Sequence, residues 1–217
     1  MLLLLILLAG CGGERKTVVV AALGDSITAG SPLWDPNPAV RDAIGGRLDP
    51  NSQYEHWAAR GLDGVRFRNC GVFGERTDQI AVRLEQCAEE ADVLILQGGI
   101  NDIAQMRRVR TAAHHLRETV RRGKAMGLRV ALVEVLPWNN GYPLADHRIR
   151  RLNRLIHEIG RDQDVTVFPW YGRLEDPRRP GRMKREWTID GDHPSVQGYR
   201  RLGETISSGA GKGLFKR

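Results

Sequence analysis

The sequence has 217 residues, of which 41% are hydrophobic and 27% are charged. A chain of this length and composition can form one sizeable core, and no Pro- or Ser-rich linker divides it, so we expect a single folded domain. The formal net charge of +7 is uneven: residues 101–217 hold 24 basic and 13 acidic side chains, whereas residues 1–100 hold 9 and 13.

The basic second half does not by itself indicate a nucleic-acid partner. Charge asymmetry of this kind can reflect nucleic acid or an anionic membrane. Here the arginines between residues 107 and 122 fall around the whole circumference of a predicted helix, and neither an RNA-binding aromatic motif nor a zinc-ligand spacing accompanies them. We therefore predict a solvated surface and no nucleic-acid partner, with attraction to anionic lipid as a secondary effect.

The N-terminus has features of an export signal. Residues 1–10 form a Leu- and Ile-rich run that is too short to span a bilayer but has the length of a signal-peptide hydrophobic region. The small residues before Cys11 resemble a bacterial lipoprotein processing site. They predict lipidation of Cys11, a tether over residues 11–16, and export to the cell envelope, the periplasm or the medium. No Lys or Arg precedes the run, so an apolar leader without a sorting role is the alternative.

A strand is predicted directly after this tether. The β-branched run over residues 17–23 ends at Gly24, and the segment 24–28 reads Gly-Asp-Ser-Ile-Thr. Ser26 then lies at the carboxyl edge of the strand, where open α/β sheets bind ligands and where a hydroxyl can serve as an acyl-transfer nucleophile. The structural alternative is a βα turn with a serine N-cap.

Strands and helices then alternate along the chain. Residues 31–51 carry four prolines and predict a loop with a short helix. Apolar patterning predicts four further strands over residues 65–69, 93–96, 128–135 and 165–168, and helices over residues 53–60, from residue 77, over 111–126, from residue 146 and through 196–206. This order predicts a three-layer α/β/α domain over residues 17–208 with a five-stranded parallel sheet. Residues 209–217 should form a frayed basic tail.

Two polar clusters follow the second and third strands. Gly71 and Gly74 lie in the first loop, where backbone N–H groups can point at a ligand, although a tight turn explains two glycines equally well. The second cluster reads Gly-Gly-Ile-Asn-Asp over residues 98–102. Asn101 can donate a side-chain N–H to a developing negative charge and Asp102 can hold the loop, while a helix-capping turn is the alternative.

The last part of the chain holds a candidate base. The loop over residues 136–145 carries exposed aromatics that suit one wall of a substrate cleft, and residues 169–187 are predicted to be irregular. The segment 190–194 then reads Asp-Gly-Asp-His-Pro, with Pro194 expected in the first turn of the final helix. Asp190 can fold back and accept a hydrogen bond from the His193 imidazole, and Asp192 is the weaker candidate for this role.

Cys70 and Cys87 leave two possibilities open. An oxidising compartment would permit a disulfide between them, and the bridge is sterically possible between a strand end and the following helix. Two buried free thiols are the alternative.

Together, the four polar clusters resemble the SGNH hydrolase superfamily, also called GDSL-type esterases and lipases. The resemblance spans residues 18 to about 206, and its four blocks are Gly24-Asp25-Ser26-Ile27, Asn69 to Gly74, Gly99-Ile100-Asn101-Asp102 and Asp190-Gly191-Asp192-His193-Pro194.

The resemblance implies a flavodoxin-like fold and a role for each block. It makes Ser26 the nucleophile and His193 the base that Asp190 orients. It gives the oxyanion hole the N–H of Ser26, the N–H of Gly74 and the side chain of Asn101. Gly74 is preferred to its neighbour Gly71 because it directly precedes a polar segment, as the family's glycine does.

The sequence therefore predicts a serine-dependent hydrolase of carboxylic esters that acts through a Ser-His-Asp triad and an acyl-enzyme, without a metal or organic cofactor. Its substrate is expected to be a small-molecule ester with a short acyl chain. Lysophospholipids, thioesters and acetylated carbohydrates are the alternatives that the family resemblance leaves open. A lipid-anchored binding protein on a catalytically silent scaffold is the non-enzyme alternative.

Overall fold

The computed structural model describes residues 17–211 and 213–216. The predicted signal peptide, Cys11 and the tether up to residue 16 lie outside the described residues.

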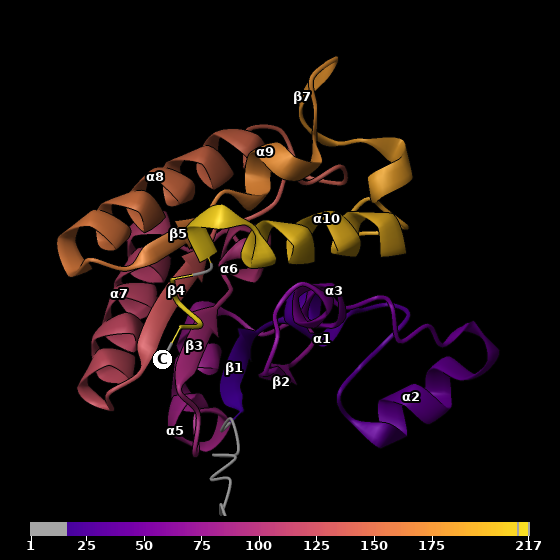
Figure 1. The fold of residues 1–217 in the computed structure, drawn as a ribbon. Helices are drawn as coiled ribbons and strands as arrows, with labels where there is room; N and C mark the ends of the chain where they lie inside the picture. Colours follow the sequence, from indigo (N-terminus) through magenta and orange to yellow (C-terminus); the bar gives the residue numbers. More distant parts are fainter. Residues whose placement is uncertain (1–16, 212, 217) are drawn as a thin grey trace, which may run out of the picture.

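Five parallel strands form the central sheet, in the spatial order β2-β1-β3-β4-β5 (Figure 1). Their bounds are Val18–Gly24 (β1), Val65–Gly71 (β2), Val93–Leu96 (β3), Arg129–Val133 (β4) and Thr166–Phe168 (β5). All five predicted strands are present, with ends that differ by one or two residues. The predicted α/β class is confirmed, and the strand order is that of flavodoxin-like folds.

Helices connect the strands and cover both faces of the sheet. Their bounds are Ser26–Ala29 (α1), Pro38–Ile44 (α2), Tyr54–Arg60 (α3), Thr77–Val82 (α4), Leu84–Cys87 (α5), Ile100–Ala104 (α6), Val109–Ala125 (α7), Ala145–Gln163 (α8), Trp170–Leu174 (α9) and Val196–Ser207 (α10), with short 3-10 turns at Gly45–Arg47, Arg185–Trp187 and Gly209–Gly211.

Two hydrophobic cores, one on each face, hold the sheet between two helical layers. Alternate residues of a strand point to opposite faces, so Leu23 packs against α4, α5, α7 and α8, while its neighbour Ala22 faces α3, α9 and α10. β1, β3 and β4 are nearly continuous apolar runs because both of their faces are covered, as in other parallel sheets, whereas the edge strand β2 alternates apolar and polar residues. Among the described residues, no helix is both long and apolar enough to cross a bilayer.

The predicted helix from residue 77 is in fact two short helices. α4 ends at Arg83, which is also the N-cap of α5. The apolar spacing continues across the break, with Ile80, Leu84 and Cys87 all buried, so the pattern alone did not reveal it. The break turns the Arg83 side chain toward the ends of β1 and β2, where it contacts backbone carbonyls.

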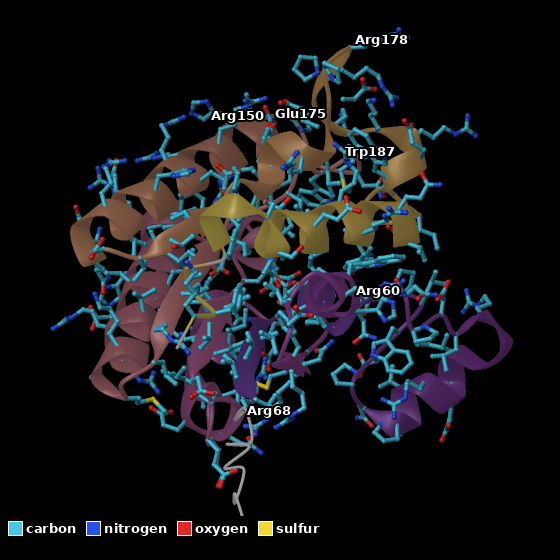
Figure 2. All side chains as sticks on the ribbon, viewed as in Figure 1. Arg60, Arg68, Arg150, Glu175, Arg178 and Trp187 are labelled. Atoms are coloured by element: carbon cyan, nitrogen blue, oxygen red, sulfur yellow. A yellow bond between two sulfur atoms is a disulfide. The ribbon has the colours of Figure 1, made fainter. Side chains whose placement is uncertain are left out.

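The prediction of an irregular segment over residues 169–187 was wrong. The segment contains α9 and an antiparallel hairpin, β6 (Glu175–Asp176) and β7 (Arg179–Met183). Figure 2 shows Arg178 at the tip of this hairpin. A salt bridge of 2.5 Å between Glu175 and Arg150 joins its base to α8, so ordered contacts replace the expected loop.

Two predictions near the C-terminus were also wrong. Pro194 is not in the first turn of α10, because Ser195 caps that helix and Pro194 instead forms an isolated bridge with Thr188. The described residues of the expected tail, 209–211 and 213–216, are not frayed. Phe215 is buried in the core beside α10, where it fills space next to Phe67, and an aromatic side chain so placed fixes the segment that carries it.

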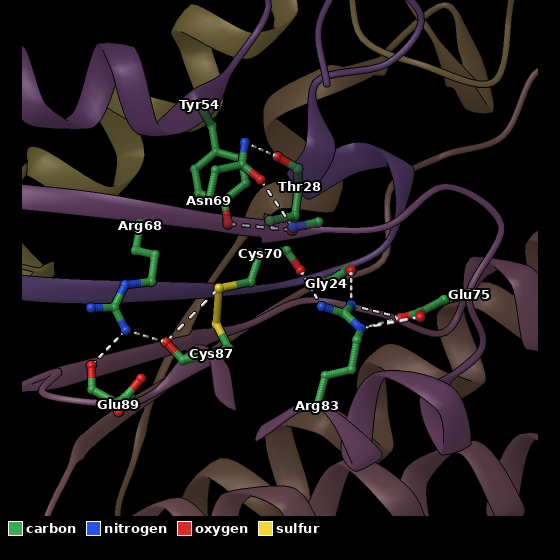
Figure 3. The surroundings of a disulfide bond; sticks show 11 residues. Gly24, Thr28, Tyr54, Arg68, Asn69, Cys70, Glu75, Arg83, Cys87 and Glu89 are labelled. Atoms are coloured by element: carbon green, nitrogen blue, oxygen red, sulfur yellow. Dashed lines mark hydrogen bonds and ion pairs between the residues drawn. A yellow bond between two sulfur atoms is a disulfide. The ribbon is translucent and has the colours of Figure 1, made fainter. Parts of the chain in front are cut away.

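A disulfide joins Cys70 at the end of β2 to Cys87 at the end of α5, with a Cα separation of 6.0 Å (Figure 3). The structure therefore contains the bridge rather than the free thiols that the sequence also allowed.

Candidate active site

Loops at the carboxyl edge of the sheet gather the candidate site residues. The strand order reverses direction between β1 and β3, and this switch point is where flavodoxin-like folds bind their ligands. Ser26 follows β1, Asn101 follows β3, and the loop before α10 brings His193 to the same edge.

The turn that carries Ser26 is built by neighbouring polar side chains. Asp25 caps α1 by accepting a hydrogen bond from the Ile27 N–H at 2.9 Å, and its own N–H donates to Gln97 Oε1 at 3.0 Å. Gln97 also accepts from Thr28 Oγ1. A Cβ at Gly24 would lie 2.2 Å from Thr28 Oγ1, so only glycine fits before this turn.

Burial raises the pKa of Asp25 to about 6, although the hydrogen bonds from Ile27 and Gln97 partly oppose that shift. Through these hydrogen bonds Asp25 braces the turn that carries Ser26.

Ser26, His193 and Asp190 lie in one hydrogen-bonded row. The Ser26 Oγ is 3.0 Å from His193 Nε2, and His193 Nδ1 is 2.7 Å from Asp190 Oδ2. The other oxygen of Asp190 accepts the backbone N–H of Asp192 and that of His193. These bonds fold the loop so that carboxylate and imidazole face each other.

Opposing effects act on the pKa of the Asp190 carboxyl. Partial burial disfavours its charged form, but the hydrogen bonds from the His193 ring and from the two backbone N–H groups outweigh it and hold the pKa below its usual value. Asp190 is therefore ionised at neutral pH, which favours the imidazole tautomer that carries its proton on Nδ1.

Asp192 points away from the imidazole, as expected from the sequence. Its Oδ1 accepts hydrogen bonds from Trp138 Nε1 and from Asn140 Nδ2, each at 2.7 Å. Asn140 also donates to the Asp190 carbonyl at 2.9 Å. These contacts join the loop after β4 to the loop that carries His193.

The two candidate glycines differ in whether their N–H groups are free. The Gly71 N–H donates to Asn69 Oδ1 at 2.9 Å, and a Cβ at Gly71 would lie 2.0 Å from the Ala29 nitrogen. Gly71 thus lets β2 pass close to α1. The Gly74 N–H donates to no acceptor within the described residues, and its φ of 78° suits glycine.

Asn101 is fixed next to this glycine. Its Nδ2 donates to the Glu75 carbonyl at 2.9 Å, which leaves its second N–H available. The following residue, Asp102, accepts hydrogen bonds from the N–H and hydroxyl of Thr77, so it caps α4 and holds the two loops together.

Sequence reasoning missed three residues of this region. Phe73 is 66% exposed and stacks on the His193 ring at a centroid distance of 6.1 Å. Gln97 and Arg83 bind the backbone around Ser26. Phe73 could have been noted as an apolar residue between two loop glycines. Gln97 and Arg83 lie in an ordinary strand end and an ordinary helix pattern, so nothing in the sequence marked them as site residues.

A narrow cavity lies beside the turn that carries Ser26. It is lined mostly by apolar side chains, among them Ile27, Ile100, Val135, Trp138 and Trp170, and its volume of about 10 Å³ is that of a single water-sized sphere. Of the aromatic residues in the loop over residues 136–145, Trp138 lines this cavity. Within the part of the chain that the structure describes, no group of His, Cys, Asp or Glu side chains is arranged to hold a metal ion.

A wider surface groove, about 530 Å³, lies elsewhere, between α7 and α8. Arg110 and Arg117 of α7 line it together with Arg151 and Arg154 of α8. These arginines belong to neither the Ser26 row nor the narrow cavity.

The sequence profile of the GDSL-like lipase/acylhydrolase family matches residues 22–201, a span that runs from β1 into α10. The chain belongs to this family. The resemblance that the four sequence blocks indicated is thereby confirmed, and this GDSL-family protein is a hydrolase of the lipase/acylhydrolase class. No curated protein matches the chain.

Solved structures share the fold of this GDSL-family protein at low identity. A protein assigned to the G-D-S-L lipolytic family from Desulfitobacterium hafniense DCB-2 superposes with a TM-score of 0.72 at 18% identity, over 88% of this chain and 98% of its own. A G-D-S-L family member from Veillonella parvula DSM 2008 superposes with a TM-score of 0.69 at 17% identity, over 88% of this chain and 96% of its own. The lipase/acylhydrolase from Enterococcus faecalis superposes with a TM-score of 0.64 at 25% identity, over 88% of this chain and 94% of its own.

Proposed function

We propose that this GDSL-family hydrolase cleaves carboxylic esters through an acyl-enzyme on Ser26, with His193 as the base and Asp190 as the residue that orients it. The observation that carries the proposal is the continuous hydrogen-bonded row from Ser26 Oγ through both ring nitrogens of His193 to Asp190. A serine hydroxyl is a weak nucleophile at neutral pH and needs an adjacent base, and this row supplies one.

In the first half of the reaction, Ser26 Oγ attacks the ester carbonyl carbon while His193 Nε2 takes the hydroxyl proton. The tetrahedral intermediate collapses, the bond to the alcohol oxygen breaks, and His193 returns the proton to the leaving alcohol. In the second half, water gives a proton to His193 and attacks the acyl group. Collapse of the second intermediate releases the carboxylic acid and restores the proton of Ser26.

The negative charge of each intermediate requires hydrogen-bond donors at fixed positions. We assign these to the N–H of Ser26, the N–H of Gly74 and the second N–H of Asn101 Nδ2. Neither backbone N–H donates to an acceptor within the described residues, and Asn101 is held by Glu75. The free N–H at Gly74 and the occupied one at Gly71 support the choice of Gly74.

The narrow cavity supports a short acyl chain. Its volume of about 10 Å³, that of one water-sized sphere, suits a methyl-sized group, and Trp138 forms part of its wall. Acetyl and similarly small acyl groups are therefore the proposed substrate class. Lysophospholipids, thioesters and acetylated carbohydrates remain the alternatives.

Residues 1–16 support a proposal about location that is independent of the chemistry. We propose export by the apolar leader and anchoring through a lipid on Cys11, which would place the enzyme at a bacterial envelope membrane. A disulfide between Cys70 and Cys87 is compatible with an oxidising compartment.

The test is hydrolysis of a 4-nitrophenyl ester series from acetate to palmitate, run beside acetylated sugars and a lysophospholipid, with Ser26→Ala as the blank. We expect the highest kcat/KM on acetate or propionate, and a decline as the chain outgrows the cavity. A preference for long chains would contradict the short-chain assignment. Absence of any Ser26-dependent hydrolysis across the panel would contradict the enzyme itself and favour a silent scaffold that only binds.

A further inference from the structure

The loop that carries Gly74 has little packing of its own. A Cβ built on Gly74 meets no atom within 4 Å, and the preceding Phe73 is largely exposed. The hydrogen bond that closes the turn, from the Glu75 N–H to the Val72 carbonyl, is 3.4 Å long. The loop is also joined to β1 by the Val72 N–H, which donates to the Gly24 carbonyl at 3.1 Å, and Phe73 stacks on the His193 ring. Because neither contact involves Gly74 itself, the position of its N–H depends chiefly on how Glu75 is held.

Glu75 is held at both its side chain and its backbone. Its carboxylate accepts two short hydrogen bonds from Arg83, from Nε at 2.9 Å and from Nη2 at 2.6 Å. Its carbonyl accepts the 2.9 Å hydrogen bond from Asn101 Nδ2. Glu75 therefore lies between two of the three proposed oxyanion donors, Gly74 and Asn101, and contacts Asn101 directly.

Arg83 joins this loop to the strand that precedes the nucleophile. Besides Glu75, its guanidinium donates to the Gly24 carbonyl at 3.0 Å through Nη2 and to the Cys70 carbonyl at 2.7 Å through Nη1 (Figure 3). Gly24 lies two residues before Ser26. The side chains of Arg83 and Glu75 are only 22% and 16% exposed, so water and salt screen this ion pair less than a surface pair.

The disulfide restrains the backbone on which Arg83 lies. Cys87 is one helical turn after Arg83, and its bond to Cys70 holds α5 against β2. The carbonyl of Cys70 is itself an acceptor for Arg83. The guanidinium is thus presented to β1, β2 and the Gly74 loop from a covalently fixed element.

We propose that Arg83 and Glu75 are positioning residues for the oxyanion hole. The Arg83–Glu75 pair sets the distance between the Gly74 N–H, the Asn101 amide and Ser26, and neither side chain contacts substrate. This inference rests on the proposed function, because it assigns a task within that same site.

A positioning role predicts a loss in kcat rather than in KM. The oxyanion exists in the intermediate and not in the bound ester, so displaced donors weaken the transition state more than the ground state. Misplacement of such groups by about 1 Å costs up to about a hundredfold in rate. Arg83→Met should therefore lower kcat about ten- to a hundredfold and leave KM nearly unchanged.

The experiment measures kcat and KM on 4-nitrophenyl acetate for Arg83→Met, Arg83→Lys and Glu75→Gln. Arg83→Lys should retain more activity than Arg83→Met, because it keeps the charge but loses the planar fork. Arg122→Met is the matched control: Arg122 makes the same kind of pair with Glu85 at 2.6 Å and also binds a backbone carbonyl, but on the exposed surface of α7. The control should retain wild-type kcat.

A double-mutant cycle with Asn101→Ala separates positioning from general destabilisation. If Arg83 acts through the oxyanion hole, Arg83→Met should cost much less in the Asn101→Ala background than in the wild type. Losses that simply multiply would overturn the inference, as would an Arg83→Met variant that matches Arg122→Met in kcat.

Thermal unfolding is recorded for every variant. Should Arg83→Met not fold, Glu75→Gln takes its place in the cycle, and wild-type kcat in that variant would overturn the inference. The proposed function fails separately, namely if the wild type hydrolyses no faster than Ser26→Ala.

Discussion

The Asp190 carboxylate accepts hydrogen bonds from three N–H groups, two on the backbone and one on the His193 ring. The backbone bonds to Oδ1 set the loop, and the ring bond from His193 Nδ1 to Oδ2 sets the tautomer. Because Oδ1 holds the loop and Oδ2 sets the tautomer, a substitution can remove the second function and preserve the first.

Asp190→Asn is expected to preserve the conformation of the loop but to change the tautomer of His193. The retained oxygen still accepts the backbone N–H groups, but an amide nitrogen opposite Nδ1 favours the imidazole that carries its proton on Nε2, which cannot accept the Ser26 proton. We expect kcat to fall by about 10⁴-fold, the loss found for the corresponding change in a serine protease triad.

Steady-state kinetics and thermal unfolding check this prediction. The melting temperature should stay close to that of the wild type. Asp192→Asn is the control, because Asp192 accepts from Trp138 and Asn140 rather than from the ring, and it should lose far less activity. Equal losses in the two variants would contradict the assignment of Asp190.

At the scale of elements, α3 and α10 pack closely on one face of the sheet and enclose a carboxyl group. A Cβ at Gly203 of α10 would lie 2.5 Å from the Tyr54 carbonyl of α3, which shows how near the two backbones come. Glu55 of α3 is buried, and neither of its carboxyl oxygens has a hydrogen-bond partner within the described residues. Burial raises the pKa of Glu55 well above its usual value.

This carboxyl makes stability depend on pH. The native state keeps the Glu55 proton, whereas the unfolded chain releases it above about pH 4.3, so the native state binds more protons and stability falls as pH rises. Asp25, whose pKa burial raises to about 6, contributes in the same direction between about pH 4 and pH 6.

Glu55→Met is expected to remove the Glu55 part of this dependence. An apolar side chain of similar size leaves no buried charge to neutralise, so the gain in free energy of unfolding over the wild type should be larger at pH 8 than at pH 5. Urea titrations at the two pH values measure it, with the exposed Glu89→Met as control. A variant that is less stable than the wild type at pH 8 would contradict the prediction.

At the scale of the whole molecule, much of the fold could be predicted from local sequence. Four of the strands, β1, β3, β4 and β5, are short β-branched or apolar runs between turn residues, and β2 alternates apolar and polar residues. Ser26 and Asn101 lie in the short helices α1 and α6 that follow β1 and β3, and His193 lies in the loop before α10. Because carboxyl ends of parallel strands meet at one edge of a sheet, predicting the strands also placed these side chains near one another.

What could not be predicted depends on contacts between segments distant in sequence. The break at Arg83 lies inside a continuous apolar pattern, and only the carbonyls of Gly24 and Cys70 explain its direction. The hairpin over residues 175–183 is rich in Pro and Arg, which favour a loop locally, but Glu175 binds Arg150 across the structure. Likewise, the number of residues between Cys70 and Cys87 does not predict the distance between them in the folded chain.

Labelling with a fluorophosphonate tests the central claim most directly, because the reagent forms a covalent bond only with an activated serine. Intact mass and peptide mapping should show one adduct, on Ser26, that is absent from Ser26→Ala and formed far more slowly by Asp190→Asn. Equal labelling of the wild type and Ser26→Ala, or an adduct on a different serine, would contradict the account.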